Sequence, residues 1–161
     1  TVGRLDSRFK GRDVRAAGQS PDFDPSMEAI RGPYTAALND YVRRELEFRS
    51  DLPYEILTGR VHPWDYSRWE NRYVDVAPDL RSAMVRNADL RVFHAGGWYD
   101  MATPPFAADW VFNHMELEPS DRERIERAYY PAGHMMYVHE ESREALDRDL
   151  GAFYDRAIGT D

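Results

Sequence analysis

Two short apolar runs, each followed by a polar turn, constrain the fold of this chain more than any other feature. The first covers residues 90–95 and is followed by Gly96-Gly97-Trp98-Tyr99-Asp100. The second covers residues 125–130 and is followed by Pro131-Ala132-Gly133-His134-Met135-Met136. Runs of this length, bounded by Gly, Pro and Asn, are typical of buried strands. The pattern predicts a strand, a turn with an aspartate, a helix, a second strand, a turn with a histidine and a final helix.

The helix between the two runs has a clear start signal. Thr103 precedes Pro104 and Pro105, which predicts a Thr cap with prolines in the first turn, where a missing N–H costs nothing. We expect this helix to end at about Asn113. Its predicted buried face consists of apolar residues at helical spacing, namely Phe106, Ala107, Trp110, Val111 and Met115.

Parallel strands joined by right-handed helical crossovers place their following turns at one edge of the sheet, where ligands and catalytic groups collect. Asp100 and His134 are therefore expected to meet, although 34 positions separate them. An acid that orients a histidine base is part of the Ser-His-Asp mechanism, and α/β-hydrolases have the acid before the histidine. A plainer alternative stays open, in which Asp100 only caps the next helix and His134 is a structural histidine.

The first half of the chain has a different character. Residues 11–25 are predicted to be an exposed loop, Pro33 to start a helix, residues 51–73 to hold little regular structure, and residues 75–87 to form a helix. The predicted apolar positions of the two helices are Tyr34, Ala37, Leu38, Tyr41, Val42 and Leu46, and Val76, Leu80 and Met84. We interpret residues 1–73 as a segment that caps the active site, and residues 74–161 as the α/β core.

Two stretches, 97–104 and 132–135, resemble the acid and histidine motifs of the serine carboxypeptidase family, in particular its bacterial members; stretches 2–9 and 32–41 are also similar. These α/β-hydrolases remove residues from peptide C-termini. The resemblance implies an α/β fold that contains the last two parallel strands of the hydrolase sheet with flanking helices. It further implies Asp100 as triad acid, His134 as base, and Met135 as a wall of the pocket for the leaving residue. A peptide substrate and no cofactor are expected.

The resemblance also implies a nucleophilic serine in a Gly-Glu-Ser-Tyr motif, beside an acidic residue that binds the substrate carboxylate. Neither is present, and no serine lies in a Gly-x-Ser-x-Gly elbow; the serines are Ser7, Ser20, Ser26, Ser50, Ser67, Ser82, Ser120 and Ser142. We therefore expect the chain to be the C-terminal part of a longer precursor, inactive alone and partnered by the part with the serine. The alternatives are a non-catalytic fragment, a module that binds a partner through an exposed sheet edge, and another α/β-hydrolase or acyltransferase.

Composition excludes some classes of function. The net charge of −8 argues against nucleic-acid binding, which requires a basic surface, and no apolar segment approaches the roughly 20 residues that span a bilayer. The chain has no cysteine and hence no disulfides, and the resemblance leaves a secreted or periplasmic location open. A metal site is the weaker alternative, because its potential ligands lack the close pairing of zinc motifs; they are His94, Asp100, His114, His134 and His139.

Overall fold

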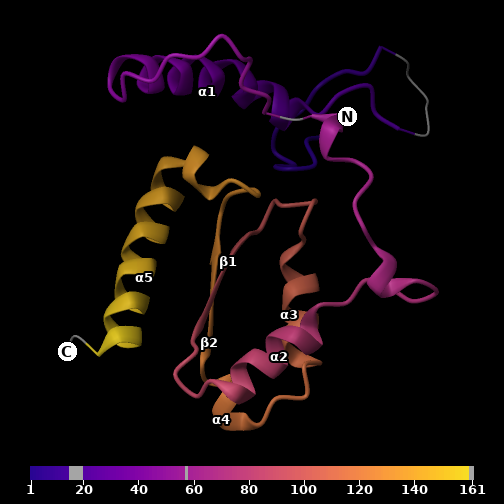
Figure 1. The fold of residues 1–161 in the computed structure, drawn as a ribbon, viewed down its shortest axis with the longest axis vertical. Coiled ribbons are helices and arrows are strands. Elements are labelled where there is room, and N and C mark those ends of the chain that lie inside the picture. The colour runs from indigo at the N-terminus through magenta and orange to yellow at the C-terminus, as the bar shows by residue number, and fades with distance from the viewer. Residues whose placement is uncertain (15–19, 57, 160–161) are drawn as a thin grey trace. The chain divides into compact units, whose positions relative to one another are not determined.

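The chain folds into two units in the computed structural model, which describes residues 1–14, 20–56 and 58–159 (Figure 1). One unit combines Thr1–Ser26 with Val76–Asp161, and the other is Met27–Asp75. The first 26 residues thus group with the C-terminal part, whereas the sequence interpretation placed them in the cap-like segment 1–73. Local composition does not show this grouping, because it depends on hydrogen bonds to turns about a hundred positions further along the chain.

The larger unit is built around two parallel strands, β1 (Val92–Gly97) and β2 (Ile125–Tyr130). They are aligned with Val92 opposite Ile125 and Gly97 opposite Tyr130. The second strand has the predicted bounds, whereas the first begins and ends two residues later than predicted. In the described part of the chain the sheet has these two strands only, and the arrangement is α/β in this coarse sense.

Helices cover both faces of the two strands (Figure 1). One face carries α5 (Glu140–Ile158), and the other carries α2 (Ala77–Arg86) and α3 (Pro105–Asn113), with the short α4 (Pro119–Arg122) leading into β2. Successive side chains of a strand point to opposite faces. Accordingly, the ring of Phe93 packs 5.4 Å from that of Phe153 in α5, and the ring of His94 packs 5.4 Å from that of Phe112 in α3.

Each face has its own apolar cluster. Met84 of α2 is fully buried among Phe112, Met115 and Leu117, and Val92 and Ile125 of the strands complete this cluster. On the other face, Tyr130, Ala132 and Met136 pack against small residues of the strands and against α5. The predicted helix over residues 75–87 is confirmed as α2, with Met84 inward and Leu80 against the cluster, but Val76 is exposed.

The buried face of α3 differs from the predicted one. Of the predicted residues, Met115 is buried as expected, but Phe106 is 73% exposed and Trp110 is 62% exposed. Ala108 and Phe112 contact the core in their place. Both sets have helical spacing, so periodicity does not decide between them in a helix with apolar residues on more than one side. The Thr cap is also wrong: Pro104 is the capping residue, without a side-chain bond, because the Thr103 hydroxyl is engaged elsewhere.

The smaller unit contains most of α1 (Pro25–Arg44) and two single 3₁₀ turns, Gly59–Val61 and Ser67–Trp69. The prediction that Pro33 starts a helix is wrong, since Pro33 lies inside α1, which begins at Pro25. The scarcity of regular structure between residues 51 and 73 is confirmed, with Leu57 outside the described residues. Residues 15–19 of the predicted loop 11–25 also lie outside the described residues. None of the described residues between 27 and 75 is buried.

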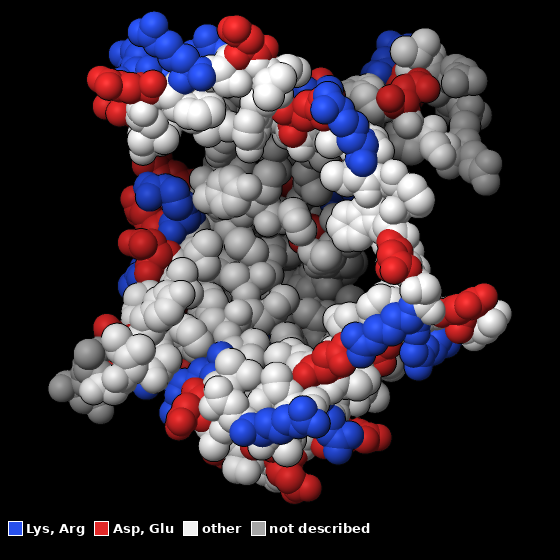
Figure 2. All heavy atoms as spheres, in the orientation of Figure 1, with Lys and Arg blue, Asp and Glu red and all other residues white. Residues whose placement is uncertain are grey.

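The surface carries charges of both signs. Acidic and basic side chains of the described residues are interspersed on the face shown in Figure 2. No helix in the described ranges is long and apolar enough to cross a membrane.

Candidate active site

Asp100 and His134 lie in the turns that leave the carboxyl ends of the two strands. β1 ends at Gly97, and the Asp100 amide donates to the Gly97 carbonyl at 3.2 Å, which closes a tight turn. β2 ends at Tyr130, and the Tyr99 amide donates to the Ala132 carbonyl at 3.0 Å, which joins the two turns. The parallel strands thus bring two side chains together that are 34 positions apart in the chain.

The His134 ring and the Asp100 carboxylate form a hydrogen bond of 2.8 Å between Nδ1 and Oδ2. An ionised carboxylate only accepts, so Nδ1 carries the proton in the neutral ring and Nε2 has the free lone pair. The Asp100 side chain is only 4% exposed, whereas that of His134 is 45% exposed. The acid is therefore enclosed, and the basic nitrogen is on a ring that reaches solvent.

Four donors hold the Asp100 carboxylate. The amides of Ala102 and Thr103 donate to Oδ1 at 2.8 and 2.9 Å, and the Thr103 hydroxyl donates to Oδ2 at 2.6 Å. Burial raises the pKa of Asp100, but the bonds from Thr103, His134 and Ala102 together lower it more, so the pKa lies below its ordinary value. Asp100 is consequently ionised at neutral pH and able to stabilise a protonated His134.

Thr103 contributes more to this site than the sequence suggested. Its hydroxyl oxygen lies 3.1 Å from His134 Nδ1 as well as 2.6 Å from Asp100 Oδ2. It therefore touches both members of the pair on the same side of the ring, and it does not occupy the Nε2 side, where a nucleophile must lie. In the sequence, Thr103 before two prolines predicted a helix cap, because threonine is also a common capping residue.

The N-terminal segment supplies backbone partners to both turns. The Leu5 carbonyl accepts from the His134 amide at 2.6 Å, the Arg4 carbonyl accepts from the Met101 amide at 3.0 Å, and the Ser7 amide donates to the Tyr99 carbonyl at 2.9 Å. Sequence reasoning from the residues missed this role, because backbone bonds leave no side-chain signature.

Two glycines permit the close approach of these segments. A Cβ on Gly97 would lie 2.2 Å from the Gly133 carbonyl oxygen, and one on Gly133 would lie 2.3 Å from the Leu5 carbonyl oxygen. Such distances are far inside van der Waals contact, so both positions require glycine. Met135, the third predicted site residue, follows His134 directly and is half-buried.

None of the eight serines, all of which lie in the described residues, hydrogen-bonds to His134. Ser142 does bond to a histidine, with Oγ 2.8 Å from His139 Nδ1, while His139 Nε2 lies 3.0 Å from Glu141 Oε2. Ser142 is only 1% exposed, at the start of α5. This cluster therefore ties His139 to the first turn of α5 and does not present a nucleophile to a substrate.

The described residues contain no group of three or more His, Asp or Glu side chains that could hold a metal ion. His94 lies inside β1, as expected, and its buried Nε2 has no hydrogen-bond partner among the described residues. Burial lowers the pKa of His94, as does Arg127, while Asp109 opposes them, and the net shift is downward. The ring is therefore neutral at pH 7 and packs between Phe112 and Tyr129.

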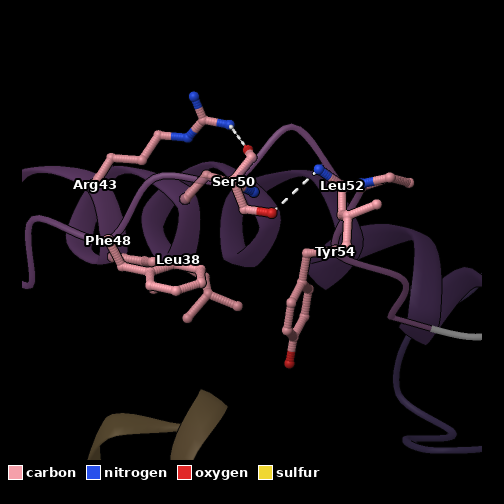
Figure 3. Close-up of a pocket in the computed structure, with 9 residues that line it drawn as sticks. Leu38, Arg43, Phe48, Ser50, Leu52 and Tyr54 are labelled. Carbon is pink, nitrogen blue, oxygen red and sulfur yellow. Dashed lines mark hydrogen bonds between the residues drawn. The ribbon is translucent and has the colours of Figure 1, made fainter.

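A separate hollow of about 200 Å³ lies in the smaller unit, between α1 and the segment that follows it. Figure 3 shows Leu38, Phe48 and Tyr54 on one side of α1, with the Arg43 guanidinium on the other side, where it donates to the Ser50 carbonyl at 3.5 Å. The walls of this hollow are mostly apolar and contain no acid–base pair, so the hollow offers no catalytic chemistry of its own.

Comparisons with models of protein families, with curated proteins and with solved structures find no match to this chain.

Proposed function

We propose that Asp100 and His134 are the acid and base of a Ser-His-Asp triad in a serine-type carboxypeptidase, and that the nucleophilic serine lies outside residues 1–161. The observation that carries the proposal is the 2.8 Å bond from His134 Nδ1 to an enclosed, ionised Asp100, on a ring that is otherwise open to solvent. The resemblance of stretches 97–104 and 132–135 to serine carboxypeptidases supports a peptide C-terminus as the substrate.

In the proposed reaction, the serine oxygen attacks the carbonyl carbon of the last peptide bond, and its proton moves to His134 Nε2. Asp100 stays ionised and stabilises the imidazolium through Nδ1. When the tetrahedral intermediate collapses, the C–N bond breaks and Nε2 gives its proton to the departing amino group. Water then attacks the acyl-enzyme, with Nε2 as the base, and the serine is regenerated. Met135, next to His134 in the same turn, is the proposed wall of the pocket for the leaving residue.

A fluorophosphonate probe tests the triad, because it reacts only with an activated serine. In the native protein that contains this chain, we expect labelling at a single serine outside residues 1–161. His134→Ala should abolish it, and the matched variant His139→Ala should retain it. Labelling of any of the eight serines of this chain, or unchanged labelling of His134→Ala, would remove the triad assignment.

The substrate class needs a separate measurement. We expect the native protein to release the last residue from a peptide with a free C-terminus, and to leave the same peptide intact when its C-terminus is amidated. Equal cleavage of both peptides would keep the triad but exclude a carboxypeptidase, and would point to another hydrolase or an acyltransferase of this fold.

A second candidate function is partner binding. In the described residues β1 pairs with β2 alone, so one edge of β1 keeps unpaired backbone groups, and Phe106 and Trp110 of α3 are exposed. Open strand edges and exposed aromatic faces are typical of protein interaction sites. A native protein that forms a complex through this chain without any fluorophosphonate labelling would favour this candidate.

A further inference from the structure

We propose that Asp6 and Arg8 are positioning residues that hold the histidine turn in register with the aspartate turn, a role that rests on the proposed function of Asp100 and His134. The two residues belong to the segment whose backbone bonds to both turns. Their side chains add a second set of contacts, independent of those backbone bonds.

The Asp6 carboxylate and the Arg8 guanidinium form a two-pronged pair. Arg8 Nη2 donates to Oδ2 at 2.7 Å, while Arg8 Nε and the Arg8 amide donate to Oδ1 at 3.0 Å. Parallel N–H···O bonds of this kind fix the plane and direction of the guanidinium as well as its position. Asp6 is buried, and Arg8 is partly exposed. The guanidinium is therefore held in one orientation by the carboxylate.

That orientation directs Arg8 to both turns of the site. Its third nitrogen, Nη1, donates to the Pro131 carbonyl at 2.7 Å, three residues before His134. Its guanidinium carbon lies 4.7 Å from the centre of the Tyr99 ring, one residue before Asp100. A cation over an aromatic face is attracted by the ring quadrupole. One guanidinium thus contacts the histidine turn through a carbonyl and the aspartate turn through a ring.

Asp6 itself also contacts the histidine turn. The pKa of Asp6 is raised by burial and lowered more strongly by Arg8, with a further lowering by the Gly133 amide, so the carboxylate is ionised at neutral pH. A Cβ on Gly133 would lie 2.4 Å from the Asp6 Cβ, which shows how closely the two backbones approach. The residue before His134 therefore lies directly against the ion pair.

Loss of the Asp6–Arg8 pair should lower the rate of catalysis, because a misplacement of about 1 Å in a catalytic group lowers rates by about 10²-fold.

The chain offers a matched control at the opposite end of the strands. Arg124 forms a pair with Asp121 at 2.5 Å and donates to the carbonyls of Asn87, Leu90 and Met84, each at 2.9 Å. This second carboxylate–guanidinium pair also bonds to backbone carbonyls, but it lies next to the start of β2 and not next to His134.

The test compares Arg8→Lys and Asp6→Asn with Arg124→Lys in the native protein. We expect the first two variants to lower kcat by about 10- to 100-fold with little change in KM. They should also weaken or abolish the downfield proton signal of His134 Nδ1, observed by NMR with labelled histidine. Arg124→Lys should lower the unfolding temperature while preserving both kcat and the His134 signal. If Asp6→Asn does not fold, Arg8→Lys still decides the question, because it keeps the positive charge and loses only the planar fork.

Two results would overturn the proposal: a normal His134 signal in folded Arg8→Lys, or an equal loss of that signal in Arg124→Lys. The NMR readout also separates the two hypotheses. If the native protein hydrolyses no peptide, the proposed function fails, while the His134 signal in the variants still shows whether Asp6 and Arg8 hold the pair in place.

Discussion

The Thr103 hydroxyl contacts both members of the candidate pair, 2.6 Å from Asp100 Oδ2 and 3.1 Å from His134 Nδ1. It is therefore part of the hydrogen-bond network that fixes the orientation of the imidazole.

Replacing Thr103 by Val removes this hydroxyl with almost no change in shape. We expect kcat of the native protein to fall by about tenfold, on the order of 1.4 kcal/mol in the barrier, because Asp100 loses a donor and the His134 ring is held less firmly. Thr103→Ser keeps the hydroxyl and is the matched control, for which we expect kcat near that of the wild type. Steady-state kinetics on a C-terminally free peptide makes the comparison, and equal rates for Val and Ser would exclude a role for the hydroxyl.

Asp100 should make stability depend on acid pH. Its pKa in the folded protein is lowered below the ordinary value of about 3.9. The stability it contributes is therefore fully present above the unfolded pKa, and it is lost as the pH falls through the lower folded pKa. We expect the free energy of unfolding in urea to be higher for the wild type than for Asp100→Asn. This difference should be largest at about pH 7 and should shrink below about pH 4. A difference that stays constant from about pH 7 to about pH 3 would contradict this.

Gly97 and Gly151 should respond in opposite ways to alanine. At Gly97 a Cβ would overlap the carbonyls of Gly133 and Ala132, whereas at Gly151, inside α5, nothing lies within 4 Å of it. We expect Gly97→Ala to destabilise the protein and displace the histidine turn. Gly151→Ala should stabilise it by about 0.5–1 kcal/mol, because alanine is the better helix former. Thermal unfolding of both variants gives the answer, and a tolerated Gly97→Ala would show that the two turns are further apart than described.

Met84 should contribute strongly to the stability of the larger unit. It is fully buried between α2 and the strands, whereas its neighbour Val85 is exposed. We expect Met84→Ala to lower the free energy of unfolding by about 2–5 kcal/mol, and Val85→Ala to change it by no more than about 0.5 kcal/mol. Urea denaturation of the two variants checks this, and similar values for both would mean that α2 does not pack as described.

Sequence patterns predicted the regular elements of the larger unit better than their contacts. Period and boundary residues located both strands and α2, because turn residues and apolar runs are local signals. The predicted buried face of α3 was wrong except for Met115, because two stripes of equal spacing compete there and only tertiary packing selects the one with Phe112. Pro33 was misread for a related reason: proline marks a first turn in most helices, but here the helix already begins at Pro25.

The candidate site shows the same limit. Asp100 and His134 were found because strand topology predicts which turns adjoin. Sequence patterns did not reveal the roles of Asp6, Arg8 and the Leu5 carbonyl. Their partners are far away in sequence, and no local periodicity indicates such contacts. The resemblance of stretch 2–9 assigned no role to either residue, and opposite charges two positions apart also occur on exposed surfaces.

The separation between Arg8 and Pro131, 123 positions in the chain, has a consequence for how this protein folds. The contact closes a loop that contains the whole smaller unit, so the histidine turn cannot reach its final place until residues 8–131 have all been made. The entropy lost in closing a flexible loop rises only slowly with its length, by roughly 0.6 kcal/mol per doubling. Insertions or deletions among residues 27–75 should therefore cost the acid–base pair little, which leaves that part of the chain free to diverge.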